Sequence, residues 1–362
     1  MLKVSTIVGA RPQFIKAALV SRAFQKVSTV EIEEVMVHTG QHYDETMSKV
    51  FFDQLGLAAP RYSLGIGGGS HGQQTGRMLA AIEEVLVHES PGWVVVYGDT
   101  NSTLAGALTA AKLHIPIAHV EAGLRSWNRQ MPEEVNRIVT DHLSDLLFAP
   151  TETAVQNLTR EGITTGVHLV GDVMQDAIAE YRRIAEERSS VLNALGLETH
   201  GYLLVTVHRA ENTDNTDRLS NIVRAVRKLA ETNVIVWPVH PRTRKELARI
   251  EADISNVRII APVGYVDMIA LESNARVVLT DSGGVQKEAK WLRVPCVTLR
   301  DETEWVETLV DGWNRLAGAD PERIVAAAMR EFQKSNGKSP EMNSAGAASQ
   351  IVKHIVAATS QG

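Results

Sequence analysis

The chain has 362 residues, of which 44% are hydrophobic and 22% are charged, and its formal net charge at pH 7 is -6. This length is more than one ordinary hydrophobic core needs, and the composition excludes a disordered chain. The mild acidic charge argues against nucleic acid or an anionic membrane surface as the main partner. An anionic ligand would therefore have to be held by local donors.

The single cysteine, Cys296, lies in an apolar run and excludes a disulfide framework within the chain. Its surroundings fit a small buried hydrophobic side chain. The first residues have the pattern of a β-strand followed by charge and proline, not that of a signal peptide. No stretch has the ~18 apolar residues of a membrane helix. We therefore expect a cytoplasmic protein with no membrane partner.

Short apolar runs alternate with amphipathic helical patterns along the chain. The predicted strands are Val4–Val8, Glu34–His38, Trp93–Tyr97, Ile115–Val120, Leu146–Ala149, Val167–Val170, Tyr202–Val207, Val234–Pro238, Val257–Ile260, Val277–Thr280 and Cys296–Leu299. The predicted helices include Pro12–Gln25, Gly76–His88, Ser102–Leu113, Glu133–Leu143, Asp217–Leu229, Tyr265–Asn274 and Ala345–Ala358. Continuously apolar strands separated by helices indicate parallel sheets covered on both faces. Right-handed crossovers then give an α/β protein with two Rossmann-like, doubly wound domains.

The boundary between the two domains is predicted near Gly171. The segment Tyr181–Leu197 is helical and charged, and a new series of strands and helices follows it. Residues 1–170 would form the N-terminal domain and residues 171–344 the C-terminal domain. We expect residues 345–362 to form a last helix that packs back on the N-terminal domain.

In open parallel sheets, ligands bind outside the carboxyl ends of the strands. The first strand ends in the segment Gly9–Lys16, in which Pro12 suits the first turn of a helix. Arg11 and Lys16, together with the free amides of that turn, could face an anion. An ordinary strand-to-helix turn with solvated charges is the alternative.

Carboxylates gather after later strands of the first half. Asp99 follows a strongly apolar strand, where an unpaired carboxylate would be costly; capping of the next helix by Asp99 or Thr100 is the alternative explanation. Glu121 and Glu133 flank one loop at the same edge of the sheet. Converging carboxylates raise one another's pKa and supply acid and base groups. Glu134, which follows Glu133 behind Pro132, is assigned to the helix dipole.

The most specific pattern of the second half is Thr280–Glu288, in which a strand runs directly into glycines that open a helix. Gly283 and Gly284, beside Ser282, would let backbone amides approach a phosphate at the positive end of the helix dipole. Glu288 lies one turn along this helix, within reach of ribose hydroxyls. A simple turn at these glycines is the alternative.

Several other chemistries lack their sequence patterns. The segment Gly65–Ser70 lacks the last glycine of a dinucleotide fingerprint, and no Walker A motif is present. The histidines show no paired metal-ligand spacing, and no GxSxG elbow supports a serine hydrolase. We predict no metal site.

In order and spacing, these segments resemble the non-hydrolysing UDP-N-acetylglucosamine 2-epimerases over essentially the full chain. The matching motifs are Gly9–Lys16, Gly98–Thr100, His119–Arg125, Pro132–Arg137, His208–Asn212, Pro238–His240, Thr280–Glu288 and Arg300–Glu304. The resemblance implies a GT-B architecture with the active site in the cleft between two Rossmann-like domains. It also implies a homodimer that needs no added cofactor.

The resemblance further implies an elimination–addition reaction on UDP-GlcNAc. The C2 proton is removed and UDP leaves C1 to give 2-acetamidoglucal; UDP then adds back while a proton returns to the other face of C2, giving UDP-ManNAc. The family's acid/base carboxylates fall on Asp99, Glu121 and Glu133. The resemblance does not fix which of them serves which face of C2. Its catalytic histidine falls on His208, beside the pyrophosphate.

The family's ligand contacts also have counterparts in this chain. Its basic residues match Lys16 and Arg11. Its pyrophosphate loop matches the three residues Ser282, Gly283 and Gly284, and its ribose contact matches Glu288.

The chain departs from the usual family pattern in two places. Gln13 stands where most members have glutamate, and the loop Ser126–Met131 also differs. Both features resemble the subgroup that epimerises UDP-2,3-diacetamido-2,3-dideoxyglucuronate for surface polysaccharides. In that case Arg129 would meet the sugar carboxylate; a solvated loop arginine is the alternative.

Bacterial members of the family also have an allosteric site for UDP-GlcNAc. Gln41, His42 and His240 match part of that site, whereas Gly72–Arg77 matches it less well. Besides epimerisation, three activities remain open at this point: hydrolysis of the same UDP-sugar, glycosyl transfer by the shared fold, and non-catalytic sensing of a nucleotide sugar.

Overall fold

The computed structural model describes residues 1–41, 56–310, 312–330 and 346–359, except for the side chain of Arg11. No helix among these residues is both long enough and apolar enough to cross a membrane.

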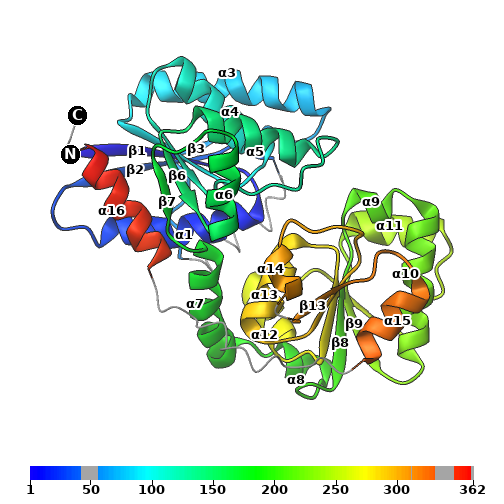
Figure 1. The fold of residues 1–362 in the computed structure, drawn as a ribbon. Helices are drawn as coiled ribbons and strands as arrows, with labels where there is room; N and C mark the ends of the chain where they lie inside the picture. The colour runs from blue at the N-terminus through cyan, green and yellow to red at the C-terminus, as the bar shows by residue number, and fades with distance from the viewer. Residues whose placement is uncertain (42–55, 311, 331–345, 360–362) are drawn as a thin grey trace. The chain divides into compact units, whose positions relative to one another are not determined.

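The chain forms two compact units (Figure 1). Unit 1 comprises Met1–Ala177 and Asn343–Gly362, and unit 2 comprises Ile178–Met342. The division therefore falls between Ala177 and Ile178, inside a helix, whereas the sequence pattern had placed it near Gly171.

Unit 1 contains a parallel sheet and its covering helices. The strands are β1 (Leu2–Val8), β2 (Ile32–His38), β3 (Tyr62–Ser63), β4 (Trp93–Tyr97), β5 (Ile117–Val120), β6 (Leu146–Ala149) and β7 (Val167–Leu169). The helices are α1 (Arg11–Gln25), α3 (His71–Glu89), α4 (Asn101–Lys112), α5 (Pro132–Leu143), α6 (Glu152–Arg160) and α16 (Ala347–Thr359). Helix α7 (Val173–Arg188) begins in unit 1 and ends in unit 2.

Unit 2 has the same kind of organisation. Its strands are β8 (Tyr202–Thr206), β9 (Val234–Pro238), β10 (Arg258–Ile260), β11 (Val277–Thr280), β12 (Cys296–Thr298) and β13 (Asn314–Leu316). Its helices are α8 (Val191–Leu195), α9 (Ala210–Thr213), α10 (Thr216–Ala230), α11 (Pro241–Arg249), α12 (Tyr265–Ser273), α13 (Gly283–Leu292), α14 (Val306–Val310) and α15 (Pro321–Met329).

In unit 1 the strand order is β3-β2-β1-β4-β5-β6-β7, and the paired strands are parallel. The central strands are apolar because both faces are covered; Val94, Val95 and Val96 of β4 are fully buried. Helices α3 and α4 pack on the core formed by β1, β2 and β4. Helix α16 packs beside α1 on the other face (Figure 1). At its end, Trp93 Nε1 donates to Thr359 Oγ1 at 3.0 Å.

In unit 2 the order is β10-β9-β8-β11-β12-β13, again with parallel pairs. Helices α10 and α15 cover one face, through Leu219, Ile222, Val226 and Ile324 among others. Figure 1 shows α12 and α13 on the opposite face. Both sheets therefore have the doubly wound order, with the first strand of the unit at the centre. The predicted fold class of two Rossmann-like α/β units is confirmed.

The strand order reverses between β1 and β4 in unit 1 and between β8 and β11 in unit 2. At such a point the loops leave the carboxyl edge in opposite directions and open a crevice. Helix α1, which carries Lys16, and the turn that carries Asp99 follow the two strands at the first reversal, and the loops that carry His208 and Ser282 lie at the second.

Two strands were missed by sequence reasoning. Strand β3 has only two residues, and β13 reads Asn-Arg-Leu, which has no apolar run. The charged helical segment Tyr181–Leu197 is also not one element. Helix α7 ends at Arg188, and α8 begins at Val191 after a pair of serines.

A buried carboxylate ties the edge of the unit 1 sheet to α3. Glu89, at the end of α3, accepts from Tyr62 Oη at 2.6 Å and from Lys3 Nζ at 3.0 Å, and Arg61 Nη1 lies 3.4 Å away. The Tyr62 hydrogen bond, followed by Lys3 and Arg61, lowers the pKa of Glu89 from 4.5 to about 2. A lowered folded-state pKa stabilises the fold above pH 4.5, and that contribution is lost as the pH falls toward 2.

We predict that Glu89→Gln lowers the free energy of unfolding at pH 7 by about 2 kcal/mol, because a charged hydrogen-bond acceptor is removed. The difference from the parent should shrink as the pH falls from 5 to 3. Urea denaturation of both proteins across this range measures it. An equal difference at pH 7 and pH 3 would contradict the assignment.

Candidate active site

A tight turn after β4 brings three of the predicted residues of unit 1 together. Gly98 has a φ of +62°, a conformation that glycine adopts without strain. A Cβ atom at Gly98 would lie 3.3 Å from Glu121 Oε2 and 3.8 Å from Lys16 Nζ. The turn therefore needs glycine both for its backbone and for the charged side chains that pack against it, and Asp99 follows directly.

Lys16 and Glu121 form an ion pair at this turn. Their side chains are only 6% and 11% exposed, so the pair is largely removed from solvent. Glu121 has a φ of +75°, which is rare outside glycine and costs of order 1–3 kcal/mol. Its N–H donates to the Phe148 carbonyl oxygen at 3.1 Å, which helps to hold this conformation. Strained residues of this kind cluster at functional sites.

The pKa of Asp99 depends on its burial and on four charged neighbours. Burial raises the pKa of Asp99; Arg137 opposes this, Glu121 and Glu133 add to it, and Lys16 opposes it. The Asp99 side chain still exposes 32% of its surface, so it remains accessible. A carboxyl group of raised pKa can hold or accept a proton nearer neutral pH. The alternative role predicted for Asp99, capping of α4, belongs to Thr100, whose Oγ1 accepts from Thr103 N at 3.3 Å.

Glu133 and Glu134 occupy the first turn of α5 but have different surroundings. Glu133 is half-buried and acts electrostatically on Asp99. Glu134 is fully buried and accepts from the backbone N–H groups of Ser126 and Trp127, each at 2.9 Å. The dipole of α5 is thus only part of the environment of Glu134, because its carboxylate also binds a loop.

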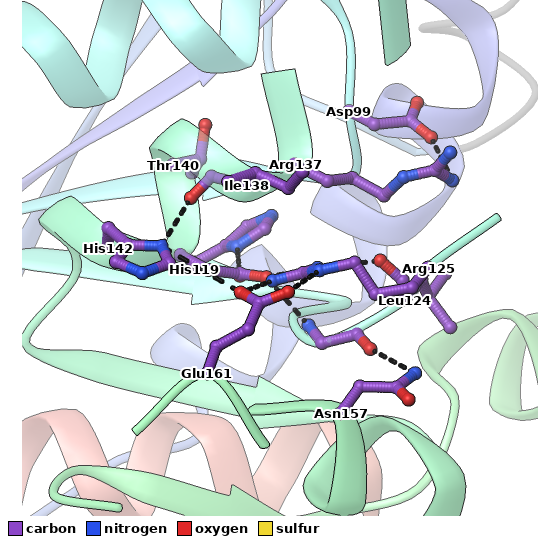
Figure 2. Close-up of polar contacts among 12 residues, drawn as sticks. Asp99, His119, Leu124, Arg125, Arg137, Ile138, Thr140, His142, Asn157 and Glu161 are labelled. Atoms are coloured by element: carbon purple, nitrogen blue, oxygen red, sulfur yellow. Dashed lines mark hydrogen bonds and ion pairs between the residues drawn. The ribbon is translucent and has the colours of Figure 1, made fainter. Parts of the chain in front are cut away.

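A buried network lies beneath the same turn (Figure 2). His119 is fully buried; its Nδ1 lies 2.7 Å from Asp141 Oδ1 and its Nε2 lies 2.7 Å from the Gly98 carbonyl oxygen. Both ring nitrogens therefore face oxygen atoms at hydrogen-bond distance. The contact of Nε2 fixes the carbonyl that precedes Asp99.

Arg125 completes the network. It makes two parallel hydrogen bonds to Glu161, both 2.7 Å long, and a third to Asp141, also 2.7 Å (Figure 2). Burial alone would raise the pKa of Asp141, but the charges and hydrogen bonds of His119 and Arg125 outweigh it and lower that pKa. His119 and Arg125 lay in a matching motif but were given no role by sequence reasoning. Asp141, twenty-two residues from His119 in sequence, had no local signal.

Gln13 connects two loops. Its Oε1 accepts from the N–H groups of Gly9 at 2.7 Å and Ala10 at 3.0 Å. Its Nε2 donates to the Tyr97 carbonyl oxygen at 2.7 Å and to Thr100 Oγ1 at 2.9 Å. An ionised glutamate has no proton to donate to that carbonyl, so this arrangement is particular to glutamine.

Three further predicted residues of unit 1 are Gln41, His42 and Arg11, and the structure describes the side chain of only the first. Gln41 Oε1 accepts from Ser102 N at 3.0 Å and Ser102 Oγ at 2.7 Å, which ties the loop after β2 to α4. His42 lies outside the described residues, and so does the side chain of Arg11.

In unit 2, the predicted phosphate loop opens α13. Ser282 is the N-cap residue, and its Oγ accepts from Val285 N at 3.5 Å. A Cβ atom at Gly283 would lie 2.4 Å from Glu304 Oε1, so a side chain there would displace the Glu304 carboxylate. Gly284 is exposed, and the nearest atom to its Cβ would be Ser282 Oγ at 3.7 Å. Only the first glycine is therefore closely packed against another side chain.

Asp281, the residue before this loop, anchors the loop after β8. Its fully buried carboxylate accepts from the N–H groups of His208 at 3.1 Å and Arg209 at 3.0 Å, and from Asn212 Nδ2 at 3.1 Å. The His208 side chain is 49% exposed, and its Nδ1 lies 3.5 Å from Asp281 Oδ1. The structure therefore brings His208 and Ser282 together through Asp281, which sequence reasoning had left without a role.

Glu288 and His240 lie elsewhere in unit 2. Glu288 is buried on α13 and accepts from Tyr265 Oη at 3.2 Å. His240 is exposed and caps α11, with its Nδ1 3.3 Å from Arg242 N. Among the residues that the structure describes, no group of three or more His, Cys, Asp or Glu side chains could hold a metal ion.

Comparisons with known proteins identify the family. The family model for UDP-N-acetylglucosamine 2-epimerase matches residues 25–356. The chain belongs to this family. It is 49% identical over 362 residues to a UDP-2,3-diacetamido-2,3-dideoxy-D-glucuronate 2-epimerase from Pseudomonas aeruginosa, covering 98% of this chain and 99% of that one.

Two further relatives come from archaea. A UDP-N-acetylglucosamine 2-epimerase homolog from Methanococcus maripaludis is 54% identical over 330 residues, which covers 90% of this chain and 91% of that protein. The crystal structure of Methanocaldococcus jannaschii UDP-GlcNAc 2-epimerase with UDP-GlcNAc and UDP has a TM-score of 0.88 and 45% identity. That match covers 98% of this chain and 100% of the other.

One buried acid of unit 2 makes the stability depend on pH. Burial, together with the charge of Glu288, raises the pKa of the fully buried Glu272 well above 4.5. A raised folded-state pKa stabilises the fold fully below pH 4.5, and that contribution is lost as the pH rises through the folded-state value.

We predict that Glu272→Gln, which is neutral at every pH, flattens the dependence of stability on pH between 5 and 9. The urea midpoint measured at several pH values tests this. Glu231→Gln is the matched control, because Glu231 is exposed and pairs with Lys228 of α10; it should keep the parent's profile. A parent-like slope in Glu272→Gln would contradict the prediction.

Proposed function

We propose that the protein interconverts UDP-GlcNAc and UDP-ManNAc at C2 without net hydrolysis, by elimination and re-addition of UDP. The observation that carries the proposal is the convergence of Asp99, Glu121 and Glu133 at one edge of the unit 1 sheet, in a chain of the epimerase family. Proton removal from one face of C2 and return to the other needs at least two groups. Three mutually interacting carboxylates can supply them.

Unit 1 would perform the proton transfers. The raised pKa of Asp99 suits a group that alternates between its acid and base forms. Glu121 is held rigidly by its ion pair with Lys16, which favours a fixed direction of proton transfer. The C2 proton is only weakly acidic, so these groups need help from charge stabilisation at the departing phosphate.

Unit 2 would bind UDP. Ser282, Gly283 and Gly284 at the N-terminus of α13 present amides to the pyrophosphate, and the helix dipole favours its negative charge. His208 is tied by its backbone to Asp281, the neighbour of Ser282, so His208 and the phosphate loop share one anchor. This shared anchor supports a role for His208 at the pyrophosphate. Glu288 would contact the ribose, and Arg11 and Lys16 would add positive charge.

A second substrate is UDP-2,3-diacetamido-2,3-dideoxyglucuronate, acted on by the same mechanism. The 49% identical Pseudomonas relative bears that substrate in its name. Gln13 and the loop Ser126–Met131 favour it as well, and the exposed Arg129 would meet the sugar carboxylate. We further propose that the protein works as a cytoplasmic homodimer in polysaccharide biosynthesis. Gln41, His42 and His240 remain a proposed regulatory site for UDP-GlcNAc.

Turnover in D2O tests the reaction directly. We expect solvent deuterium at C2 of both epimers, no net release of UDP at equilibrium, and faster turnover of one UDP-sugar than of the other. Proton NMR with each substrate measures this. Stoichiometric release of UDP and free ManNAc would instead identify a hydrolysing enzyme, and product with a fully protiated C2 would exclude the elimination.

The roles of the carboxylates are tested by substitution. Asp99→Asn and Glu133→Gln should each lower kcat by roughly 10²–10⁴-fold, the usual contribution of a general acid or base. The affinity for UDP, measured by calorimetry, should stay close to that of the parent. Glu152→Gln is the control, because Glu152 is an exposed glutamate in the first turn of α6. Near-parental kcat in either variant would remove that residue from the mechanism.

A further inference from the structure

We infer that Glu134 is a positioning residue: its buried carboxylate couples the loop at Ser126 and Trp127 to the carboxylate of Asp99 through Arg137. The inference extends the proposed epimerisation, on which its kinetic readout rests. Its main readout, the titration of Asp99, does not depend on that function.

The first half of the coupling is the bond between Glu134 and the loop. Glu134 Oε2 accepts from Ser126 N at 2.9 Å and from Ser126 Oγ at 3.1 Å, and Oε1 accepts from Trp127 N at 2.9 Å. Both carboxylate oxygens are thus used, and the side chain is fully buried. Such charge-assisted bonds to successive N–H groups define the path of the loop.

The loop needs this support because its backbone is unfavourable. Trp127 has a φ of +61°, in the left-handed region that bulky residues rarely adopt. Its side chain is nevertheless 59% exposed, so burial of the indole does not offset the cost. Within the described contacts, the hydrogen bond to Glu134 is the one that holds the N–H of Trp127 in this conformation.

The second half of the coupling is Arg137, one turn further along α5. Its Nη2 lies 2.9 Å from Glu134 Oε2, and its Nη1 lies 3.1 Å from Asp99 Oδ2. The guanidinium therefore bridges the two carboxylates, and its side chain is only 3% exposed. Figure 2 shows Arg137 reaching toward Asp99. The neighbouring Asn136 donates to the Asp99 carbonyl oxygen at 2.9 Å. Helix α5 thus holds both the backbone and the side chain of Asp99.

The bridge also sets the charge around Asp99. The charged groups that act on this carboxyl group are Arg137 and Glu133 from α5, Glu121 from the loop after β5, and Lys16 from α1. Arg137 is the strongest of these influences and lowers the pKa of Asp99. The negative charge of Glu134 partly neutralises Arg137. Removal of the Glu134 charge should therefore strengthen the effect of Arg137 and lower the pKa of Asp99 further. Removal of Arg137 should instead raise the pKa of Asp99.

The experiment compares Glu134→Gln and Arg137→Gln with the parent by carbon-13 NMR of aspartate-labelled protein. The Asp99 resonance is assigned from its loss in Asp99→Asn. We expect Asp99 to titrate at lower pH in Glu134→Gln and at higher pH in Arg137→Gln, each by roughly half a pH unit or more. In the kinetic assay, Glu134→Gln should lower kcat at least tenfold and shift the acidic limb of the pH profile downward.

Glu89→Gln is the matched control, because it removes another buried, cation-paired carboxylate of unit 1 whose described partners are Tyr62, Lys3 and Arg61. It should lose stability but leave the Asp99 titration unchanged. Unchanged titration of Asp99 in both variants, or shifts in the same direction, would overturn the inference. If one variant does not fold, the titration in the other decides. Shifts of Asp99 in a protein that epimerises neither UDP-sugar would reject the proposed function but retain the coupling.

Discussion

Buried positive charge beneath the ends of β4 and β5 is the constraint on which the unit 1 site depends. Three carboxylates close together repel one another, and their removal from water is costly. Arg137 and Lys16 compensate by contacting Asp99 and Glu121, respectively. Without these cations, the carboxyl groups would take up protons or turn toward solvent.

The compensation is arranged in layers. Asp99 and Glu121 lie in the upper layer, where Asp99 remains partly accessible. His119 and Arg125 lie below them; Asp141 contacts both, and Glu161 pairs with Arg125. Because each buried charge has a partner at hydrogen-bond distance, the lower layer is rigid, and the positions of the upper carboxylates are largely set before any ligand binds.

Unit 2 has the opposite requirement, because the ligand group proposed to bind there is negatively charged. The proposed pyrophosphate site needs donors, and the loops after β8 and β11 have backbone N–H groups there. Asp281 accepts hydrogen bonds from the N–H groups of His208 and Arg209 and so fixes the loop that carries His208, and Ser282 caps α13. Glu304 occupies the space beside Gly283 and would be displaced by a side chain there. In both units, the residues that are expected to touch the ligand are held by buried polar groups that do not.

The sequence by itself determined the doubly wound fold, because continuously apolar strands separated by amphipathic helices have few other arrangements. It also placed Asp99, Glu121, Ser282 and His208 after the carboxyl ends of strands, where such folds bind ligands, and the structure has them at these positions. Only the tertiary structure decided that Thr100 rather than Asp99 caps α4, and that Glu134 binds a loop. It alone revealed Asp141 and Asp281, because their partners are brought to them by strand pairing and helix packing, which short-range patterns do not encode.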